Sequence, residues 1–480
     1  MPTNPAGRAT RRRGRPGQPS THSARRPAVE ESAPNFTFEV VDTPPAETTF
    51  EALGVPAPII AALVKAGCPT PFPIQAATLP SSLAGRDVLG RARTGSGKTV
   101  AFAVPAVVTL ADSPKLRRPN FPRALVLVPT RELAAQVAAT TRPIAAAMGL
   151  RVAVIHGGVS QGPQVAALRA GVDVLIACPG RLEDLAQQNH CKLGAVEVCV
   201  LDEADHLADL GFLPAVKRIL DQTPAGGQRM LFSATLDRAV DTLVRRYLIN
   251  PVTHSVDSAD ATPPDLEHHA FSVTAEHKAT VVRELASGKE RSLLFTRTKH
   301  AAKKLAKDLT ERGIPAVDLH GNLSQPQRDR NLAAFANGSA RVLVATDIAA
   351  RGIHVDDIAL VVHVDPPTEH KAYLHRSGRT ARAGAKGTVV TVILPDQARD
   401  VATMIRQAGI RPASVRIAPG AAETVALTGP AAELVHRPQA PAPVQTPSRS
   451  RPGAARSRPS QPGGGTRRGG GPSSGRRRSW

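Results

Sequence analysis

Short apolar runs alternate with alanine-rich stretches along most of the chain, and this alternation constrains the fold more than any other feature. The runs are apolar throughout, which is typical of strands covered by helices on both faces. The sequence therefore predicts open, mostly parallel α/β sheets. The runs of the first half are 88–89, 124–128, 152–155, 174–177, 196–201 and 230–232, and those of the second half are 270–273, 292–295, 316–319, 342–345, 360–364 and 389–394.

A polar, proline-containing stretch separates the two halves, and segments without apolar periodicity flank them. Such segments cannot bury enough apolar surface to become ordered. We therefore expect a disordered basic tail over 1–45, a first α/β domain over 46–253, a linker over 254–265, a second α/β domain over 266–415, and a mostly disordered tail rich in Arg, Gly, Pro and Ser over 416–480.

Positive charge is concentrated in the two tails. The formal net charge is +21; residues 1–29 hold seven arginines, residues 434–480 hold ten, and neither segment holds Asp or Glu. The rest of the chain is left with only +4. This excess of charge indicates a polyanionic partner, which the tails attract without regard to sequence.

Cysteine usage and the apolar runs bear on location. None of the four cysteines forms a C-x-x-C pair, so a zinc site is disfavoured and a reducing compartment is expected. No apolar signal-peptide region follows the N-terminus, and the longest apolar run, 100–111, is too short to cross a membrane. We therefore expect a cytoplasmic protein without a membrane segment.

A glycine-rich stretch after the first apolar run has the character of a phosphate-binding loop. Glycines let backbone N–H groups approach phosphate oxygens, and the N-terminus of the following helix attracts negative charge. We expect Lys98 to neutralise the β and γ phosphates and Thr99 to ligate Mg²⁺. The stretch consists of Ala92, Arg93, Thr94, Gly95, Ser96, Gly97, Lys98 and Thr99, with Ala92 where the strict pattern has glycine.

Three carboxylates stand at the end of the run 196–201: Asp202, Glu203 and Asp205. A solvated acidic loop is the alternative, but the phosphate loop gives the carboxylates a purpose. We expect Asp202 to hold Mg²⁺ through water and Glu203 to orient and deprotonate the attacking water. The residues alone thus predict a site that hydrolyses a nucleoside triphosphate.

The string Asp202-Glu203-Ala204-Asp205 is also the name motif of a family. Over about residues 50–394 the chain resembles the DEAD-box ATP-dependent RNA helicases of superfamily 2, with further motifs in the family's order. The resemblance implies two tandem RecA-like domains, ATP and Mg²⁺ as cofactors, and RNA as the partner, contacted mainly through its backbone.

For the nucleotide, Phe72-Pro73-Ile74-Gln75 is similar to the family's Q motif, in which Gln75 reads the adenine edge. Phe50 has the spacing of the aromatic that stacks on the base, although an isolated aromatic is more often a core residue. In the stretch similar to motif V, Gly352 precedes His354, where the family has an aspartate that contacts ribose. This departure predicts weaker or pH-sensitive ATP binding.

For RNA, the resemblance implies contacts from both halves. In the first half they come from stretches similar to motif Ia, the GG doublet and motif Ib, with Cys178 replacing the usual threonine of motif Ib. In the second half they come from stretches similar to motif IV, the QxxR motif and motif V. The residues are Pro129, Thr130, Arg131, Gly157, Gly158, Pro179, Gly180, Arg181, Thr296, Arg297, Gln325, Arg328 and Thr346.

The remaining motifs imply coupling between the two activities. Ser233 and Thr235, in a stretch similar to motif III, link hydrolysis to strand separation through hydrogen bonds to the acidic motif. The stretch 373–382 resembles motif VI, with Ala381 where the family has glycine. It implies that Arg379 and Arg382 reach the γ-phosphate as arginine fingers and that His375 bonds Asp205.

The expected function is therefore RNA-stimulated ATP hydrolysis coupled to local unwinding or remodelling of RNA duplexes and RNA–protein complexes. A superfamily 2 DNA helicase or translocase, and an ATP-gated RNA clamp or chaperone, are the alternatives. We expect a monomer. The basic tails resemble those of bacterial DEAD-box proteins that act on structured RNA, which implies ribosomal or RNA-degradation machinery as a partner.

Overall fold

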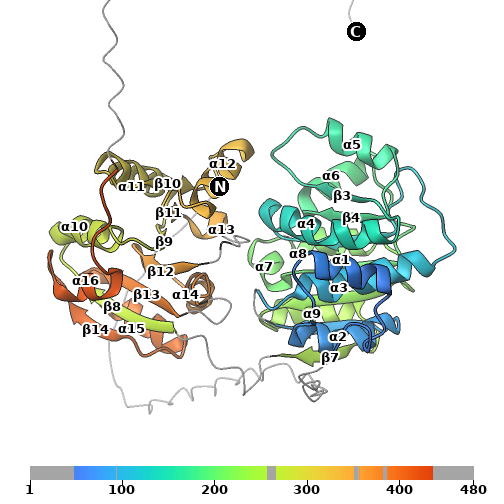
Figure 1. Cartoon of the computed structure of the whole chain (residues 1–480), viewed down its shortest axis with the longest axis horizontal. Helices are drawn as coiled ribbons and strands as arrows, with labels where there is room; N and C mark the ends of the chain where they lie inside the picture. The colour runs from blue at the N-terminus through green and yellow to red at the C-terminus, as the bar shows by residue number, and fades with distance from the viewer. Residues whose placement is uncertain are drawn as a thin grey trace, which may run out of the picture. The chain divides into compact units, whose positions relative to one another are not determined.

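Two parallel sheets follow one another along the chain, each with helices packed against it (Figure 1). The computed structural model describes residues 48–92, 95–256, 266–350, 355, 357–381 and 386–435. Every strand pairing within the two sheets is parallel. The predicted pair of parallel α/β domains is therefore confirmed.

The first sheet has seven strands in the order β3-β4-β2-β5-β6-β1-β7. They are β1 (Val88–Arg91), β2 (Ala124–Leu127), β3 (Val152–Ile155), β4 (Val174–Ala177), β5 (Val198–Leu201), β6 (Gln228–Ser233) and β7 (Val252–Ser255). The helices of this domain are α1 (Ala57–Lys65), α2 (Pro73–Leu83), α3 (Lys98–Asp112), α4 (Arg131–Ala147), α5 (Gly162–Arg169), α6 (Pro179–Gln187), α7 (Ala204–Asp209), α8 (Leu213–Leu220) and α9 (Arg238–Tyr247).

The second sheet also has seven strands, in the order β10-β11-β9-β12-β13-β8-β14. They are β8 (Leu266–Ser272), β9 (Arg291–Phe295), β10 (Ala316–Leu319), β11 (Val342–Ala345), β12 (Ile358–His363), β13 (Gly387–Ile393) and β14 (Ala413–Arg416). The helices are α10 (Ala275–Leu285), α11 (Lys299–Glu311), α12 (Gln325–Ala336), α13 (Asp347–Ala350), α14 (His370–Ser377), the 3₁₀ turn η1 (Pro395–Gln397), α15 (Ala398–Gln407) and α16 (Ala422–Thr428).

Strand residues of the first sheet divide between two apolar cores, one on each face. In β5, Val198 and Val200 join the core built with α1–α4, whereas Cys199 and Leu201 join the core built with α5–α9. Because successive strand side chains point to opposite faces, a strand covered on both sides must be apolar at every position. This is the physical basis of the uninterrupted apolar runs in the sequence.

The structure contains elements that the apolar runs did not predict. Strands β7 and β14 lie at sheet edges, and their sequences Val-Thr-His-Ser and Ala-Ser-Val-Arg carry few apolar residues. Helix α16 packs against α10, beyond residue 415, where we expected the second domain to end. The expected tails and linker lie largely outside the described residues, so the division into these five segments stays a prediction.

Among the described residues, no helix combines the length and the apolar character needed to cross a bilayer.

Candidate nucleotide and RNA site

The glycine-rich stretch joins β1 to the N-terminus of α3. Gly95 and Gly97 have φ of +91° and +87°, the left-handed region that glycine adopts without strain. Gln75 fixes this turn from α2: its Nε2 donates to the Gly97 carbonyl at 3.0 Å, and its Oε1 accepts from the Phe72 N–H at 2.9 Å. The predicted loop thus lies at the N-terminus of α3, where backbone N–H groups can bind phosphate oxygens.

Lys98 opens α3 and is almost fully buried. Its ammonium donates to the Ala92 carbonyl at 3.1 Å and to Glu203 Oε1 at 2.8 Å. Burial alone would lower the pKa of Lys98, but the charges of Glu203 and Asp202 raise it, so the ammonium stays charged. Two of its three N–H donors are used by described residues, which leaves one for a phosphate oxygen.

Asp202 and Glu203 follow β5 and are 2% and 4% exposed. Burial raises the pKa of Asp202 to about 7, although the charge of Lys98 opposes this. Burial acts in the same direction on Glu203, but Lys98 and His206 outweigh it and hold the pKa of Glu203 well below its usual range. Asp202 is therefore a buried carboxylate that added positive charge would stabilise. Carboxylate oxygens are ligands that Mg²⁺ prefers, so this residue fits a divalent cation next to the phosphate loop.

Glu203 also has an unusual backbone. Its φ of +51° and ψ of +52° lie in the left-handed region, which non-glycine residues rarely enter. His206 Nδ1 lies 3.1 Å from Glu203 Oε2, so His206 and Lys98 contact the two oxygens of this carboxylate. Strain of this kind at a buried carboxylate is a feature of functional sites.

Asp205 connects the acidic motif to β6, as the resemblance implied for Ser233 and Thr235. Its Oδ2 accepts from the backbone N–H and the hydroxyl of Thr235, both at 3.0 Å, while its own N–H donates to Ser233 Oγ at 3.3 Å. The hydrogen-bonded connection between the two motifs is therefore present. Its role in coupling stays a prediction.

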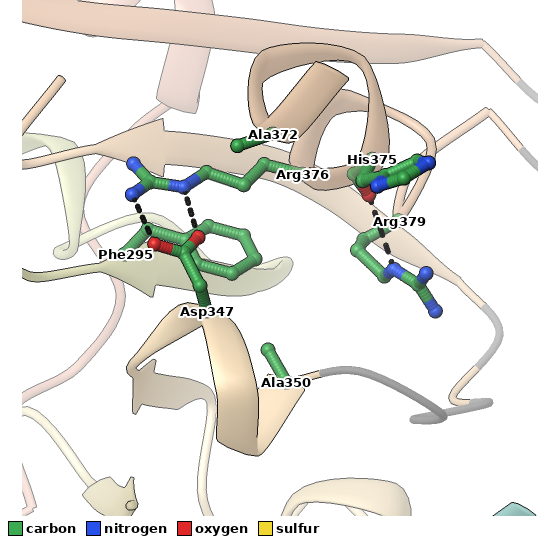
Figure 2. A pocket seen from close by; sticks show the side chains of 7 residues that line it. All are labelled: Phe295, Asp347, Ala350, Ala372, His375, Arg376 and Arg379. Carbon is green, nitrogen blue, oxygen red and sulfur yellow. Dashed lines mark hydrogen bonds and ion pairs between the residues drawn. The ribbon is translucent and has the colours of Figure 1, made fainter. Parts of the chain in front are cut away.

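In the second domain, Arg376 of α14 and Arg379, two residues after the end of α14, lie beside one small pocket (Figure 2). Arg376 Nη2 donates to Asp347 Oδ2 at 2.8 Å, and its guanidinium lies 5.0 Å from the centre of the Phe295 ring. Arg379 Nε instead donates to the carbonyl of His375 at 3.2 Å. Arg376 thus fastens α14 to α13 and β9, whereas the guanidinium of Arg379 points away from that pair.

Two contacts join α14 to the first domain. The rings of His375 and His206 meet edge to face with centroids 4.6 Å apart, and Lys371 Nζ donates to Asp237 Oδ2 at 2.6 Å. Burial, followed by the charge of His206, lowers the pKa of His375 to about 4. His375 therefore meets the acidic motif through His206; no hydrogen bond to Asp205 occurs among the described residues, and that predicted bond stays a prediction.

Most of the predicted RNA-contacting residues of the first domain surround one cavity of 600 Å³, together with Arg328 of α12. Arg131 Nη1 donates to Gln325 Oε1 at 3.1 Å, and Arg328 Nε donates to Glu132 Oε1 at 2.7 Å. The lining includes Pro129, Thr130, Arg131, Glu132, Gly157, Gly180, Arg181, Gly321 and Arg328. The guanidinium of Arg131 also lies against Gly158, where a Cβ would collide with it.

Other predicted residues lie apart from these groups. Thr296 is buried, with its hydroxyl donating to the Thr298 carbonyl, and Arg297 is exposed at the end of β9. Phe50 is 1% exposed in the core of the first domain, which is the alternative that its isolated position suggested. Predictions for Arg93, Thr94, Gly352, His354 and Arg382 concern positions outside the described residues.

Several residues of the site were not singled out from the sequence. Glu132 and His206 partner the predicted residues Arg328 and Glu203. Asp347 and Arg376 partner each other, and Arg376 is 3% exposed despite its charge. All four stand inside or beside the quoted motifs. An arginine or glutamate within an otherwise helical motif looks like a solvated charge, and only the fold reveals its partner.

Two family models match the chain, one in each of its α/β domains. A model described as "DEAD/DEAH box helicase" matches residues 72–243, and one described as "Helicase conserved C-terminal domain" matches residues 276–384. DEAD-box ATP-dependent RNA helicase 30 of Arabidopsis thaliana is 38% identical over 383 residues, covering 78% of this chain and 65% of that protein. Helicase 20 of the same plant is 36% identical over 382 residues, covering 78% and 76%.

A solved structure shares the fold. The chain titled "S. cerevisiae Dbp5 bound to RNA and ADP BeF3" matches with a TM-score of 0.67 and 27% identity, over 77% of this chain and 95% of that one. This confirms the tandem RecA-like architecture.

The matched region is only part of the length of most of these relatives. The chain spans between about a third and two thirds of the length of the first curated relatives it matches. Those relatives are proteins of plants, Dictyostelium discoideum and Pongo abelii, so the expectation of a bacterial type has no support. Two matched domain models, the identity of 36% to a relative covered over 76% of its length and the shared fold nevertheless agree: the chain belongs to the DEAD-box ATP-dependent RNA helicase family.

Proposed function

We propose that this chain is an RNA-stimulated ATPase that uses ATP to unwind or remodel short RNA duplexes and RNA–protein complexes. The observation that carries the proposal is the buried contact between Lys98 of the phosphate loop and Glu203 of the acidic motif. It joins a phosphate-binding cation to a carboxylate that can accept a proton, and both side chains are largely buried.

For hydrolysis, Lys98 binds the β and γ phosphates and Glu203 accepts the proton of the attacking water. Asp202 and Thr99 are the residues that would hold Mg²⁺, which neutralises phosphate charge when bound. Arg379, already held at α14 by its bond to the His375 carbonyl, supplies positive charge to the γ-phosphate from the second domain.

For RNA, the proposal rests on the cavity that motifs Ia, GG, Ib and QxxR line together. Backbone amides, hydroxyls and arginines on one surface suit phosphates and 2′-hydroxyls better than base edges, so we expect little sequence preference. Arg131 and Arg328 reach residues of the other domain, so RNA and ATP binding are expected to assist each other. The relative Dbp5 is bound to RNA and ADP BeF3 in its structure, in keeping with this proposal.

The test is phosphate release from ATP with and without single-stranded RNA, with single-stranded DNA of the same sequence as the comparison. Wild type should be stimulated by RNA and much less by DNA, and Glu203→Gln should show neither stimulation nor hydrolysis while still binding both ligands. Equal stimulation by DNA would favour the DNA translocase, and RNA binding gated by ATP without hydrolysis would favour the clamp.

Four further expectations stay predictions: a cytoplasmic location, a monomeric state, ribosomal or RNA-degradation machinery as partners, and attraction of RNA by the arginine-rich tails.

A further inference from the structure

The loop between α3 and β2 lies on the edge of the first sheet opposite the nucleotide. The phosphate loop and the acidic motif follow the carboxyl ends of β1 and β5, whereas the loop 113–123 leads into the amino end of β2. In a parallel sheet these are opposite edges. Between Ser113 and Arg123 the loop carries four basic residues and no acidic one, and the motifs of the family leave it unexplained.

Two of these basic residues have structural partners. Arg117 Nη2 lies 2.6 Å from Asp173 Oδ2, and Arg123 Nε donates to Glu197 Oε1 at 2.8 Å. Asp173 is 1% exposed at the side chain, so its ion pair is sheltered from water. These pairs fasten the loop to the residues that immediately precede β4 and β5.

Backbone hydrogen bonds fix the middle of the loop. The N–H of Asn120 donates to the Leu168 carbonyl, and the Asn120 carbonyl accepts from the Lys192 N–H, both at 2.8 Å. Asn120 has a φ of +64°, which turns the chain so that Phe121 bridges back to Arg118. The loop is therefore a preorganised platform, which binds a ligand with little further loss of conformational entropy.

Two other cations, one from the loop and one from a neighbouring segment, lie beside one aromatic ring. The Arg118 guanidinium lies 4.4 Å from the centre of the Phe121 ring, and Lys192 Nζ lies 5.6 Å from the same centre. Both residues are exposed, and neither forms an ion pair within the described part of the chain. Phe121 thus holds two cations in fixed positions by cation–π attraction while their charges remain available.

A hollow of 340 Å³ adjoins this arrangement. Lys115, Leu116, Arg118, Phe121, Arg123 and Ala195 line it, and Leu116 is 82% exposed. Lys115 lies 3.6 Å from Glu197, but the Lys115 side chain is 62% exposed, so water screens this contact and weakens it. Within the described part of the chain, three of the five cations of this region pair with two carboxylates, Asp173 and Glu197, which leaves an excess of three positive charges among these seven residues.

We propose that this basic loop surface, formed by Lys115, Leu116, Arg118, Phe121 and Lys192, is a second RNA-binding site that holds the phosphates of a strand outside the main cavity. Its separate cations match the repeated charges of a nucleic-acid backbone. One exposed leucine is too little apolar surface to seat a protein helix. The inference rests on the proposed function, because a strand held at both edges of the domain gains affinity through its high effective concentration.

The test compares two matched pairs of substitutions in the full chain. Arg118→Gln with Lys192→Gln removes the two ring-held cations, and Lys65→Gln with Arg142→Gln removes two exposed cations on α1 and α4. The RNA concentration that gives half-maximal ATPase stimulation is measured for oligonucleotides of about 8 and about 40 nucleotides, the shorter one being close to the site size of a single groove.

We expect the first pair to raise the half-maximal concentration of the long RNA roughly tenfold at low salt and to leave the short RNA unchanged. The slope of log affinity against log salt for the long RNA should fall by about 1.4, since each lost phosphate contact on a single strand removes about 0.7. The control pair should change the half-maximal concentration of neither RNA by more than about twofold.

Three results for the Arg118→Gln, Lys192→Gln variant would overturn the proposal. The half-maximal concentration of the long RNA could equal that of the control pair, or it could rise equally for both RNA lengths. The variant could also lose binding to polyglutamate while it still binds long RNA. The last would assign the surface to an acidic protein partner. If wild type shows no RNA stimulation at all, the proposed function fails, and direct titration of labelled long RNA by fluorescence anisotropy still decides this surface.

Discussion

Lys98 Nζ donates a 2.8 Å hydrogen bond to Glu203 Oε1, and both side chains are about 95% buried. The two residues are 105 positions apart, one at the start of α3 and the other after β5. The pair is the point at which the phosphate loop and the acidic motif become one site.

Breaking this pair from either side should have different effects. Glu203→Gln keeps an acceptor for Lys98 but loses the base, so phosphate release should fall by at least about 100-fold with little change in stability. Lys98→Met leaves a buried carboxylate with less compensation and should lower the free energy of unfolding by roughly 3 kcal/mol more than Glu203→Gln does. Urea denaturation followed by circular dichroism measures the difference; equal destabilisation would show that the Lys98 ammonium depends on the Glu203 charge as much as the Glu203 carboxylate depends on Lys98.

Ala381 provides a test of backbone strain in the motif VI region. Its φ is +54°, a conformation that costs an L-residue about 1–2 kcal/mol and glycine far less. Ala381→Gly should therefore stabilise the second domain by about 0.5–1 kcal/mol, after allowance for the greater entropy of glycine in the unfolded chain. The matched control is Ala333→Gly in the exposed interior of α12, which should destabilise by about 1 kcal/mol. Thermal denaturation of both variants would contradict the prediction if they shift in the same direction.

The buried His363 should make the second domain sensitive to acid. Its ring is fully buried beside Tyr373 and Arg376, and burial followed by the charge of Arg376 lowers the pKa of His363 well below its usual range. The unfolded chain takes up a proton below about pH 6.5 that the folded chain refuses, so this contribution to stability is present above that pH and is lost as the pH falls.

His363→Gln should remove this dependence while keeping a partner for the Thr391 hydroxyl, which lies 3.2 Å from His363 Nδ1. Between pH 6 and 5 the wild-type free energy of unfolding should fall by up to about 1.4 kcal/mol more than that of the variant. Denaturant titrations at pH 8, 6 and 5 check the slope. Parallel pH profiles would mean that His363 protonates in the folded state.

The Glu132–Arg328 pair should couple the two domains energetically. Both side chains are less than 10% exposed, and their atoms are 2.7 Å apart. A double-mutant cycle of Glu132→Ala and Arg328→Ala, read from kcat/KM of RNA-stimulated hydrolysis, should give a coupling energy of about 1–3 kcal/mol. The exposed Asp308–Arg312 pair of α11 is the control and should couple by less than about 0.5 kcal/mol. Additive effects at Glu132 and Arg328 would exclude a working contact between the domains.

Local sequence predicted the parts of the site that a single turn or strand end creates. The phosphate loop was found because glycines, a lysine and a threonine occupy consecutive positions between a strand and a helix. The acidic cluster was found because it interrupts an apolar run. The central strands were predicted because burial on both faces leaves no room for polar residues.

What the sequence did not predict depends on segments that meet only in the fold. The residues near Arg131 in the sequence do not predict that Gln325, 194 residues away, accepts its hydrogen bond. The edge strands β7 and β14 are held mainly by backbone hydrogen bonds to one neighbour, so their side chains carry little apolar signal. The left-handed Glu203 backbone is likewise imposed by its surroundings and not by residue preference.

Strand β7 has a mechanical consequence. It is the last described element before residues 257–265, and it pairs in parallel register with β1, the strand that leads into the phosphate loop. Tension that separates the two domains would therefore act first on the hydrogen bonds between β7 and β1, loading them in shear. A pull on the second domain would thus be transmitted through β7 to β1, the strand that leads into the phosphate loop.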